Sequence, residues 1–500
     1  MFLIAAMVFP THSRRLRGFH APLLSLSLLV TACWSLWSGV LSAAAAGFPL
    51  RRAYIANFES GDISFFQIAA DGQLVSLPLE PIDAGQDSNP LADTMTPDGR
   101  YLYVTNFTNA SVLAFATSPS GTLKPLGSFA PPDSPGLTQA SGIAITPDGK
   151  SLYVTYYNNA RGGAVAGFRI ESSGKLIPLG PAIASGGEGS AGDAIALDGR
   201  HLYAANSVSG TVSVFAIADD GSLQPIGNPA PSGGGTFVLA ISPDGAHLYA
   251  ANSADDTITA FDLLAGGGLT SIGNPVPSGG PGPRGILVSP DGQWLFAAHY
   301  NTGHNGSAPG SVAAFHINQD GSLALAAALS SGGNGAEALA LSPNGADLYV
   351  ANFGTSDVAS FHVCSESEDC ILMPLGDPVP TGGEFPDFQS IAIVPNQGPV
   401  AAFSFPLQRS LSVTFDGSSS QDPDGQVARF DWNFGDGASF ANGGPSPVHT
   451  YLKPGNYKVS LVVTDNEGCS ASLGFTGQSI TCNGSAAART SHLVPVRSLF

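Results

Sequence analysis

One sequence unit recurs seven times between Ala53 and about Pro395, and no other feature constrains the fold as strongly. In most copies an apolar run ends at a Pro-Asp-Gly turn, and a second run centred on an aromatic residue follows. Neighbouring aromatic residues are 46 to 53 positions apart, at Tyr54, Tyr103, Tyr153, Tyr203, Tyr249, Phe296 and Tyr349. A repeat of this length with period-two alternation predicts one four-stranded β-sheet per copy.

The two ends of the repeat region are out of phase, and this offset predicts how the sheets are arranged. The chain enters the region with a second-type strand at 53–57 and leaves it with a first-type strand at 390–395. A single sheet cannot bury both of its faces, whereas sheets stacked around an axis can. We therefore expect an all-β fold in which residues 47–396 form a seven-bladed β-propeller, closed by strands from both ends. An open solenoid built from the same repeats is the alternative.

Beyond the repeats the pattern changes, which indicates a second domain over residues 397–483. This segment contains Phe415-Asp416-Gly417, then Asp431-Trp432-Asn433-Phe434-Gly435-Asp436-Gly437, then an alternating run at 457–465. Trp432 and Phe434 alternate on one predicted strand, so both are expected in a core, and Gly435 to Gly437 predict a tight turn. Residues 484–500 are expected to form a loose tail.

Both segments resemble known families. The pattern Pro-Asp-Gly followed by Leu-Tyr-Val-Thr-Asn, complete at 97–106, resembles the YVTN repeat family and the broader group of lactonase-like seven-bladed propellers. The motif Trp-Asn-Phe-Gly-Asp-Gly at 432–437 resembles the signature of a PKD domain, an immunoglobulin-like β-sandwich. The first resemblance implies the fold but leaves the activity open, because propellers host many functions. The second implies a spacer or adhesive unit on an exported protein.

Residues 1–46 are expected to be a signal peptide. A basic segment at 14–17 precedes an apolar stretch at 21–40, and small residues suited to cleavage follow at 42–46. Two alternatives stay open. One is a lipoprotein signal ending at Cys33, and the other is an uncleaved anchor, since the apolar stretch is about long enough to span a bilayer. In each case the protein is expected outside the cytoplasm: periplasmic, at the cell surface or secreted.

The cysteines outside this segment are expected to form two disulfides. They fall into two close pairs, Cys364 with Cys370 and Cys469 with Cys482. An even number of cysteines fits an oxidising compartment. A zinc site is the alternative, but neither spacing matches CxxC or brings histidines into ligand register.

Charge and motif content narrow the classes of partner. The net charge of −19 disfavours nucleic acid, because an acidic surface repels phosphate backbones. The sequence has no P-loop and no HExxH motif, so no cofactor or catalytic metal is expected. Membrane association is expected only through an uncleaved signal or a lipid anchor. The remaining partners are an extracellular or cell-envelope protein or glycan, or a small lactone.

The sixth copy carries the candidate ligand site. Arg284 precedes its first strand, and His299 occupies a position that is Asn in five of the seven copies. Both are expected near the channel mouth, where a cation beside a histidine can bind a carboxylate, a phosphate or a lactone carbonyl. They are also the candidate catalytic residues. Further ligand-binding candidates are Asp93, Asp193, His304, Glu337 and Asp387. The alternative is that these are solvated loop charges and an ordinary channel-lining histidine.

The resemblance to lactonases also implies catalytic residues that this sequence lacks. It implies a histidine directly after the arginine and a glutamate just after the second-strand asparagine. Here Gly285 follows Arg284, and the second position holds residues such as Ser207, Ser253 or Phe353. Lactone hydrolysis needs a general base. The sequence therefore favours binding over catalysis, with a lactonase-like hydrolase of the 6-phosphogluconolactonase type as the alternative.

Four aspartates of the second domain are calcium candidates, because calcium prefers hard oxygen ligands. They are Asp416, Asp422, Asp424 and Asp436. Each also lies at a predicted turn, where an aspartate can accept hydrogen bonds from backbone N–H groups. Turn capping is the favoured interpretation.

Overall fold

The computed structural model describes residues 51–77, 80–85, 88–118, 120–134, 136–158, 162–301, 306–364, 370–406, 410–478 and 480–497. The expected signal segment, with Cys33, and the site candidate His304 lie outside these residues. The chain from Pro49 onward forms one compact unit. Within the described ranges, no helix is long and apolar enough to cross a membrane.

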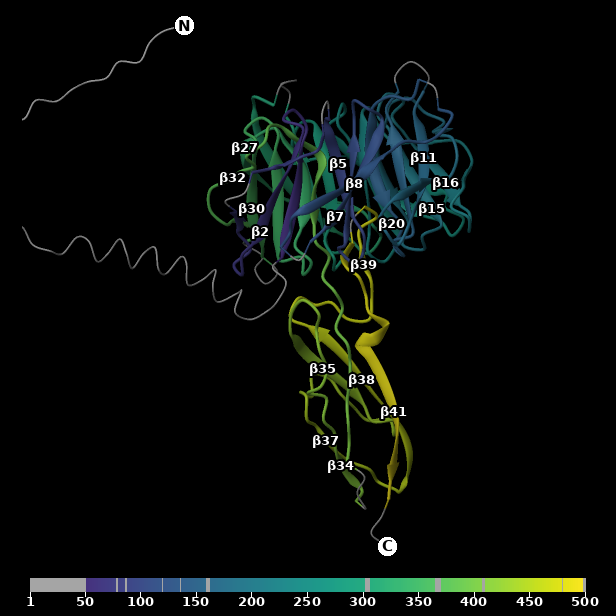
Figure 1. The fold of residues 1–500 in the computed structure, drawn as a ribbon, viewed down its shortest axis with the longest axis vertical. Helices are drawn as coiled ribbons and strands as arrows, with labels where there is room; N and C mark the ends of the chain where they lie inside the picture. The colour runs from purple at the N-terminus through teal and green to yellow at the C-terminus, as the bar shows by residue number, and fades with distance from the viewer. Residues whose placement is uncertain are drawn as a thin grey trace, which may run out of the picture. The chain divides into compact units, whose positions relative to one another are not determined.

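Seven antiparallel sheets are found in the described part of the repeat region (Figure 1). The closing sheet contains β1 (Arg52–Asn57), β2 (Asp62–Ile68), β3 (Leu74–Ser76), β4 (Ile82–Asp83) and β33 (Pro386–Ile393). The next three sheets contain β5 (Pro90–Met95), β6 (Tyr101–Asn106), β7 (Ser111–Thr117) and β8 (Leu123–Phe129); β9 (Ala140–Ile145), β10 (Ser151–Tyr156), β11 (Ala164–Ile170), β12 (Leu176–Pro178) and β13 (Ile183–Ala184); and β14 (Ser190–Ile195), β15 (His201–Asn206), β16 (Thr211–Ile217), β17 (Leu223–Pro225) and β18 (Ala230–Pro231).

The last three sheets follow the same plan. They contain β19 (Thr236–Ile241), β20 (His247–Asn252), β21 (Thr257–Leu263), β22 (Leu269–Ser271) and β23 (Val276–Pro277); β24 (Pro283–Val288), β25 (Trp294–His299), β26 (Pro309–Ile317) and β27 (Leu323–Asn334); and β28 (Ala336–Leu341), β29 (Asp347–Asn352), β30 (Asp357–Val363), β31 (Leu372–Pro374) and β32 (Val379–Pro380). The first-type strand lies at the inner edge of each sheet. These inner strands contact one another in the order β33, β5, β9, β14, β19, β24, β28 and back to β33. The sheets therefore form a closed ring, and the seven-bladed propeller is confirmed.

The ring closes as the phase of the repeats predicts. Strand β1 pairs with β33, with Ala53 opposite Ile393 and Ile55 opposite Ile391. The closing blade thus takes three principal strands from the start of the repeat region and its inner strand from the end. This pairing excludes the open solenoid.

In five of the described blades, the hydroxyl of the recurring tyrosine donates to a glycine carbonyl of the next blade. The Tyr54 hydroxyl donates to the carbonyl of Gly121 at 2.9 Å, and the Tyr349 hydroxyl donates to the carbonyl of Gly72 at 2.9 Å. Both tyrosine side chains are fully buried, so their polar ends need a partner. The spacing of the aromatic residues in the sequence therefore reflects an interaction between blades as well as a strand core.

The C-terminal domain is a second all-β unit with its own core. Its strands are β34 (Ser412–Thr414), β35 (Val427–Asn433), β36 (Ser439–Phe440), β37 (Val448–Thr450), β38 (Gly455–Asp465) and β41 (Arg489–Val496), with a short 3-10 helix at Ala486–Ala488. Trp432 and Phe434 are 2% and 3% exposed, as their alternation predicts. They pack with Phe403, Phe415 and Tyr451 in one apolar cluster.

The expected disulfides are present in the structure, but the expected loose C-terminal tail is not. The disulfides Cys364–Cys370 and Cys469–Cys482 are both present. The loose tail is wrong, because β41 pairs with β38 in a four-stranded sheet. Val494 and Val496 alternate on this strand and are buried, which supplies the apolar contact that a Ser- and Ala-rich segment was not expected to make.

Candidate functional site

Three charged residues occupy the same position on three consecutive inner strands. Arg284, Glu337 and Asp387 are each the second residue of their strand, β24, β28 and β33. Because neighbouring inner strands lie side by side, this register brings the side chains together at the end of the channel where the inner strands begin. Arg284 forms an ion pair with Glu337, and Asp387 acts electrostatically on both. The structure thus places together three of the residues predicted to line the channel mouth.

Aromatic rings hold the guanidinium of Arg284 in place. Its central carbon lies 4.0 Å from the centre of the Tyr300 ring and 5.3 Å from that of Phe237. Phe237 packs edge-on against Phe388 with centroids 4.7 Å apart, and Tyr300 packs against Phe353 at 5.6 Å. The Arg284 side chain is 30% exposed, whereas Glu337 is fully buried. A cation stacked on ring faces is preorganised and still accessible to a ligand.

The backbone beside Asp387 is strained. Phe385 and Gln389 flank it with φ values of 58° and 52°, in the left-handed region that residues other than glycine seldom adopt. Strand β33 also carries a β-bulge, between the positions opposite Ile55 and Asn57. Strained residues of this kind cluster at functional sites, because packing elsewhere must hold them in place.

The electrostatics of the group follow from burial. Burial raises the pKa of Glu337 well above its ordinary value, and the adjacent Asp387 raises it further against the opposing effect of Arg284. Burial alone would lower the pKa of Arg284, but Glu337 and Asp387 outweigh it and raise the value. The arginine therefore stays charged, and the site favours the protonated form of Glu337 more than water does.

His299 does not join this group. It is fully buried, its Nε2 lies 2.9 Å from the carbonyl oxygen of Ser278, and its Nδ1 lies 3.3 Å from that of Ser311. Burial lowers its pKa. Asn252, at the same position of the preceding blade, likewise bonds within its own blade, to the Thr257 and Thr259 hydroxyls. His299 thus bonds within its own blade and with the segment before it, as the asparagine of this position does in the preceding blade.

The structure also shows why a histidine is absent after Arg284. A Cβ atom added at Gly285 would collide with the backbone carbonyl oxygen of Glu337 on the next inner strand. No side chain fits there unless the two strands move apart. The histidine of the lactonase pattern is therefore incompatible with this arrangement of β24 and β28.

Asp93 and Asp193 lie deeper than the arginine. Each is the fourth residue of its inner strand, β5 or β14, and both are buried. Asp93 lines a small internal cavity with Gln389 and Gln478. Burial raises the pKa of both carboxyls, and for Asp93 the nearby backbone of Ala56 and Ala392 opposes part of that effect. Among the described residues, neither aspartate contacts Arg284.

The calcium candidates divide into two pairs. Asp416 accepts from the Ser418 N–H at 3.0 Å, and Asp436 accepts from the Ala438 N–H at 3.0 Å, so both cap turns. Burial raises the pKa of Asp422 to about 6 and that of Asp424 to about 7, with further contributions from nearby carboxylates. The described part of the chain contains no group of three or more His, Cys, Asp or Glu residues suited to a metal ion.

Sequence reasoning missed the aromatic residues around the arginine. Tyr300 and Phe353 follow the recurrent asparagine position, and five of the seven copies have an aromatic residue there. The five are Phe58, Phe107, Tyr157, Tyr300 and Phe353. Phe58 and Phe107 also contact each other, with centroids 5.6 Å apart. The periodic aromatic residue is the sequence signal that points to this part of the site.

Comparison with known families agrees with the two domains. The sequence matches the family described as lactonase, 7-bladed beta-propeller, over residues 93–240 and 238–307. It matches the PKD domain family over residues 396–477.

Solved structures share the propeller fold. A putative 6-phosphogluconolactonase from Bacteroides fragilis is 21% identical with a TM-score of 0.57, and covers 69% of this chain and 98% of that one. A periplasmic gluconolactonase from Pseudomonas aeruginosa is 20% identical with a TM-score of 0.57, and covers 69% of this chain and 99% of that one. At these identities the likeness shows the fold alone.

Curated relatives match a short part of the chain. A microbial collagenase from Vibrio alginolyticus is 36% identical over 95 residues, which is 19% of this chain and 11% of the relative. A collagenase from Clostridium perfringens is 43% identical over 56 residues, 11% of this chain and 5% of the relative. The chain therefore spans about a tenth or less of these relatives. The chain is therefore a seven-bladed β-propeller whose residues 93–307 match the lactonase propeller family, followed by a region that matches the PKD domain family.

Proposed function

We propose that this protein binds a sugar-derived acid, or the lactone of such an acid, at the Arg284 end of the propeller channel. The proposal rests on how the Arg284 side chain is held in place and on its exposure. Its guanidinium is fixed by Glu337 and by the faces of Tyr300 and Phe237, yet the side chain is 30% exposed. A planar guanidinium has five N–H donors, so the ion pair leaves donors for a ligand oxygen.

The surroundings fit a sugar-derived ligand. Aromatic rings offer apolar faces for the C–H surface of a sugar, and a few fixed polar groups set its orientation. The carboxylate of an acid or the carbonyl of a lactone would accept hydrogen bonds from Arg284. Asp387, which is partly exposed beside the arginine, would accept hydrogen bonds from sugar hydroxyls.

Binding is favoured over catalysis because, among the described residues, neither position expected for a catalytic histidine supplies one to the mouth. His299 is buried with Nε2 at the Ser278 carbonyl and Nδ1 at the Ser311 hydroxyl and carbonyl, and Gly285 leaves no room for a histidine. The two disulfides fit an oxidising compartment. We therefore place the protein outside the cytoplasm, with the PKD domain acting as a spacer or as an attachment to a cell-envelope protein or glycan.

Lactone hydrolysis is the second candidate, and the partly exposed Asp387 beside Arg284 favours it. A carboxylate held next to a fixed cation can act as a general base. Asp387 would take a proton from water as the water attacks the lactone carbonyl, and Arg284 would stabilise the resulting oxyanion. Asp387 would then return the proton to the ring oxygen as the ester bond breaks.

A panel of aldonic acids and aldonolactones distinguishes these functions. Each compound is titrated into the protein for binding, and each lactone is followed by pH-stat for acid release above the spontaneous rate. The binding proposal expects saturable binding with no added acid release. Acid release that disappears in Asp387→Asn would establish the hydrolase instead. Absence of both binding and turnover across the panel would reject the proposed ligand class.

A further inference from the structure

A short hairpin near the C-terminus leaves the PKD domain. Its strands are β39 (Gly474–Phe475) and β40 (Ile480–Cys482), which pair with each other. In the described part of the chain they belong to a separate two-stranded sheet and add no strand to the PKD sheets. The hairpin therefore needs another surface to bury its apolar side chains.

The inner strands of the propeller provide that surface through backbone hydrogen bonds. The N–H of Ile195 donates to the carbonyl of Gly477 at 2.8 Å, and the N–H of Ile241 donates to the carbonyl of Thr476 at 3.1 Å. Ile195 and Ile241 are the last residues of β14 and β19. The hairpin therefore meets the inner strands where they end, at the opposite end of the channel from Arg284.

Two side-chain hydrogen bonds between Gln478, at the hairpin tip, and the inner strands add to these backbone bonds. The Thr94 hydroxyl donates to the carbonyl of Gln478 at 3.3 Å, and the Gln478 amide donates to the carbonyl of Leu239. Thr94 and Leu239 belong to β5 and β19, which are separated in the ring by β9 and β14. A single residue of the hairpin therefore links two blades that do not adjoin.

Apolar contacts extend the surface that the hairpin contacts around the channel. Phe475 and Ile480 are 3% and 4% exposed and share an apolar cluster with Ile145 and Ile195. Ile480 also lines a small cavity with residues from the other inner strands, namely Leu287, Leu339, Leu341, Ile391 and Ile393. Taken together, the hairpin faces all seven inner strands.

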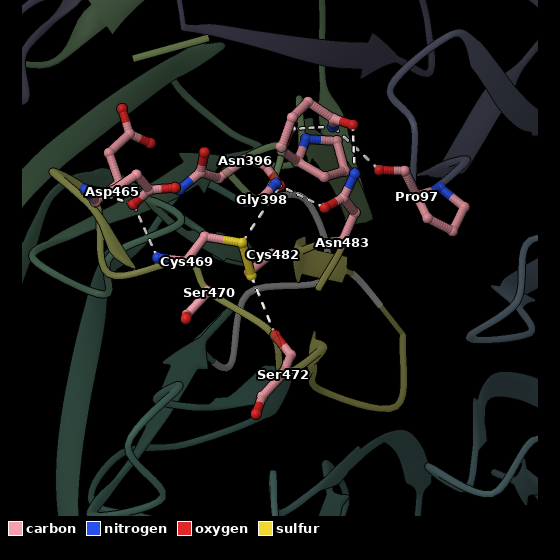
Figure 2. Close-up of a disulfide and its surroundings, with 12 residues drawn as sticks. Pro97, Asn396, Gly398, Asp465, Cys469, Ser470, Ser472, Cys482 and Asn483 are labelled. Atoms are coloured by element: carbon pink, nitrogen blue, oxygen red, sulfur yellow. Dashed lines mark hydrogen bonds between the residues drawn. A yellow bond between two sulfur atoms is a disulfide. The ribbon is translucent and has the colours of Figure 1, made fainter. Parts of the chain in front are cut away.

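The base of the hairpin is tied covalently and by hydrogen bonds. The disulfide Cys469–Cys482 closes the loop that carries it (Figure 2). Asn396, just after the last inner strand, donates through its N–H to the carbonyl of Thr481 at 3.0 Å and accepts from the N–H of Asn483 at 3.0 Å. The Gln397 side-chain amide then donates to the carbonyl of Pro97 at 3.2 Å. The hairpin and the end of the propeller are thus joined at one point.

We propose that the hairpin, described over residues 474–478 and 480–482, is an internal plug of the propeller. The plug closes the channel where the inner strands end and satisfies backbone N–H groups that would otherwise face an open pore. It also links non-adjacent blades across the axis. Ligands then reach the channel only from the Arg284 end. This proposal stands on the hairpin contacts alone and does not depend on what the Arg284 end binds.

Two glycines, Gly477 at the hairpin tip and Gly468 just before the disulfide-closed loop, provide a matched test in the full chain. Gly477 and Gly468 both have positive φ, 91° and 87°. A Cβ at Gly477 would lie 3.1 Å from the Ile241 side chain, whereas a Cβ at Gly468 would meet nothing within 4 Å. Gly477→Val therefore combines backbone strain with a steric clash against the Ile241 side chain. Gly468→Val introduces backbone strain alone.

The readout is hydrogen exchange at the amides of Ile195 and Ile241, followed by mass spectrometry of overlapping peptides. Amides that lose their acceptor exchange faster, because local opening then costs less. We expect exchange at both amides to be about tenfold faster in Gly477→Val than in the wild type, with little change in Gly468→Val. Equal protection in the wild type and in Gly477→Val would overturn the plug.

A second pair of variants covers the case in which Gly477→Val does not fold. Cys469→Ser/Cys482→Ser releases the base of the hairpin, and Cys364→Ser/Cys370→Ser removes the other disulfide, which lies outside the plug. The plug predicts faster exchange at Ile195 and Ile241 in the first pair only. The same exchange in both pairs would overturn it.

Discussion

The guanidinium carbon of Arg284 lies 4.0 Å from the centre of the Tyr300 ring. Arg284 comes from the inner strand of its blade, and Tyr300 follows the second strand of the same blade. The ion pair with Glu337 fixes the guanidinium from the next blade. Phe237 of the preceding blade also packs against it, so three blades hold one accessible cation at the channel end.

Arg284→Lys tests whether ligand binding depends on the planar guanidinium and its stacking on the Tyr300 ring, in addition to its positive charge. Lysine keeps the positive charge but has no planar fork and stacks poorly on a ring, so gluconate binding is expected to weaken by about tenfold. Arg200→Lys is the matched control, because Arg200 is an exposed arginine of another blade. Calorimetric titration measures both. Unchanged affinity in Arg284→Lys would show that the ligand senses only net charge.

Arg284→Met tests the coupling between the arginine and its buried partner. Without the cation, an ionised Glu337 is left unpaired in a fully buried site, which costs about 3–5 kcal/mol. Arg284 lowers the pKa of Glu337 against the larger effect of burial, so removing the arginine raises that pKa further in the folded state. Protonation relieves the unpaired charge at low pH, so the loss of stability relative to the wild type should grow as the pH rises from 5 to 8.

Urea unfolding of Arg284→Met at the two pH values measures this effect. Arg284→Met/Glu337→Gln is the control, because glutamine cannot ionise and should recover much of the stability lost at pH 8. An Arg284→Met variant that loses the same stability at both pH values would contradict the coupling.

His299→Asn tests the structural assignment of the histidine. The change restores the residue found at this position in five of the seven blades. Asparagine can bond to Ser311 as its counterparts bond within their own blades, so stability should change by about 1 kcal/mol or less. Gluconate affinity should stay the same. A large loss of affinity with unchanged stability would place His299 in the ligand site.

Asp424→Asn tests the acidic cluster of the PKD domain. Burial and the nearby Asp422, Glu467 and Asp465 raise the pKa of Asp424 to about 7 in the folded state. The contribution of Asp424 to the stability of the wild type is fully present below the pKa that this group has in the unfolded chain. That contribution is lost as the pH rises through about 7, the pKa in the folded state. Asp424→Asn should therefore be more stable than the wild type at pH 8, by on the order of 1 kcal/mol after solvent screening.

Asp416→Asn is the control with the opposite sign. The hydrogen bonds from Ser418 lower the pKa of Asp416, so its contribution is present at neutral pH and is lost on acidification. Asp416→Asn should thus be less stable than the wild type at pH 8. Thermal unfolding of both variants from pH 4 to 8 decides the matter, and a common sign at pH 8 would contradict this electrostatic account.

The ring and its charged group could be predicted because the repeat carries their geometry. Each copy contains its own strand and turn pattern, so the offset between Ala53 and Ile393 fixes the closing pair. Arg284, Glu337 and Asp387 occupy one repeat position, and stacked blades bring equivalent positions together. Residues at equivalent positions of consecutive repeats therefore lie close together on adjacent inner strands.

The remaining features depend on contacts that no single repeat encodes. The carbonyl of Ser278 that engages His299 precedes the blade, so the sequence did not show that the histidine was occupied. The hairpin around Gly477 has no counterpart in the repeats, and its seat is assembled from every blade. Val494 and Val496 lie in a short alternating run whose partner strand, β38, precedes it in the chain.

The most direct test of the binding account is calorimetric titration of gluconate into the wild type and Arg284→Met/Glu337→Gln. The double variant removes the guanidinium without leaving a buried charge, so its fold should be retained. The account predicts saturable binding to the wild type and none to the double variant at the same concentrations. Equal affinity for both proteins would contradict it.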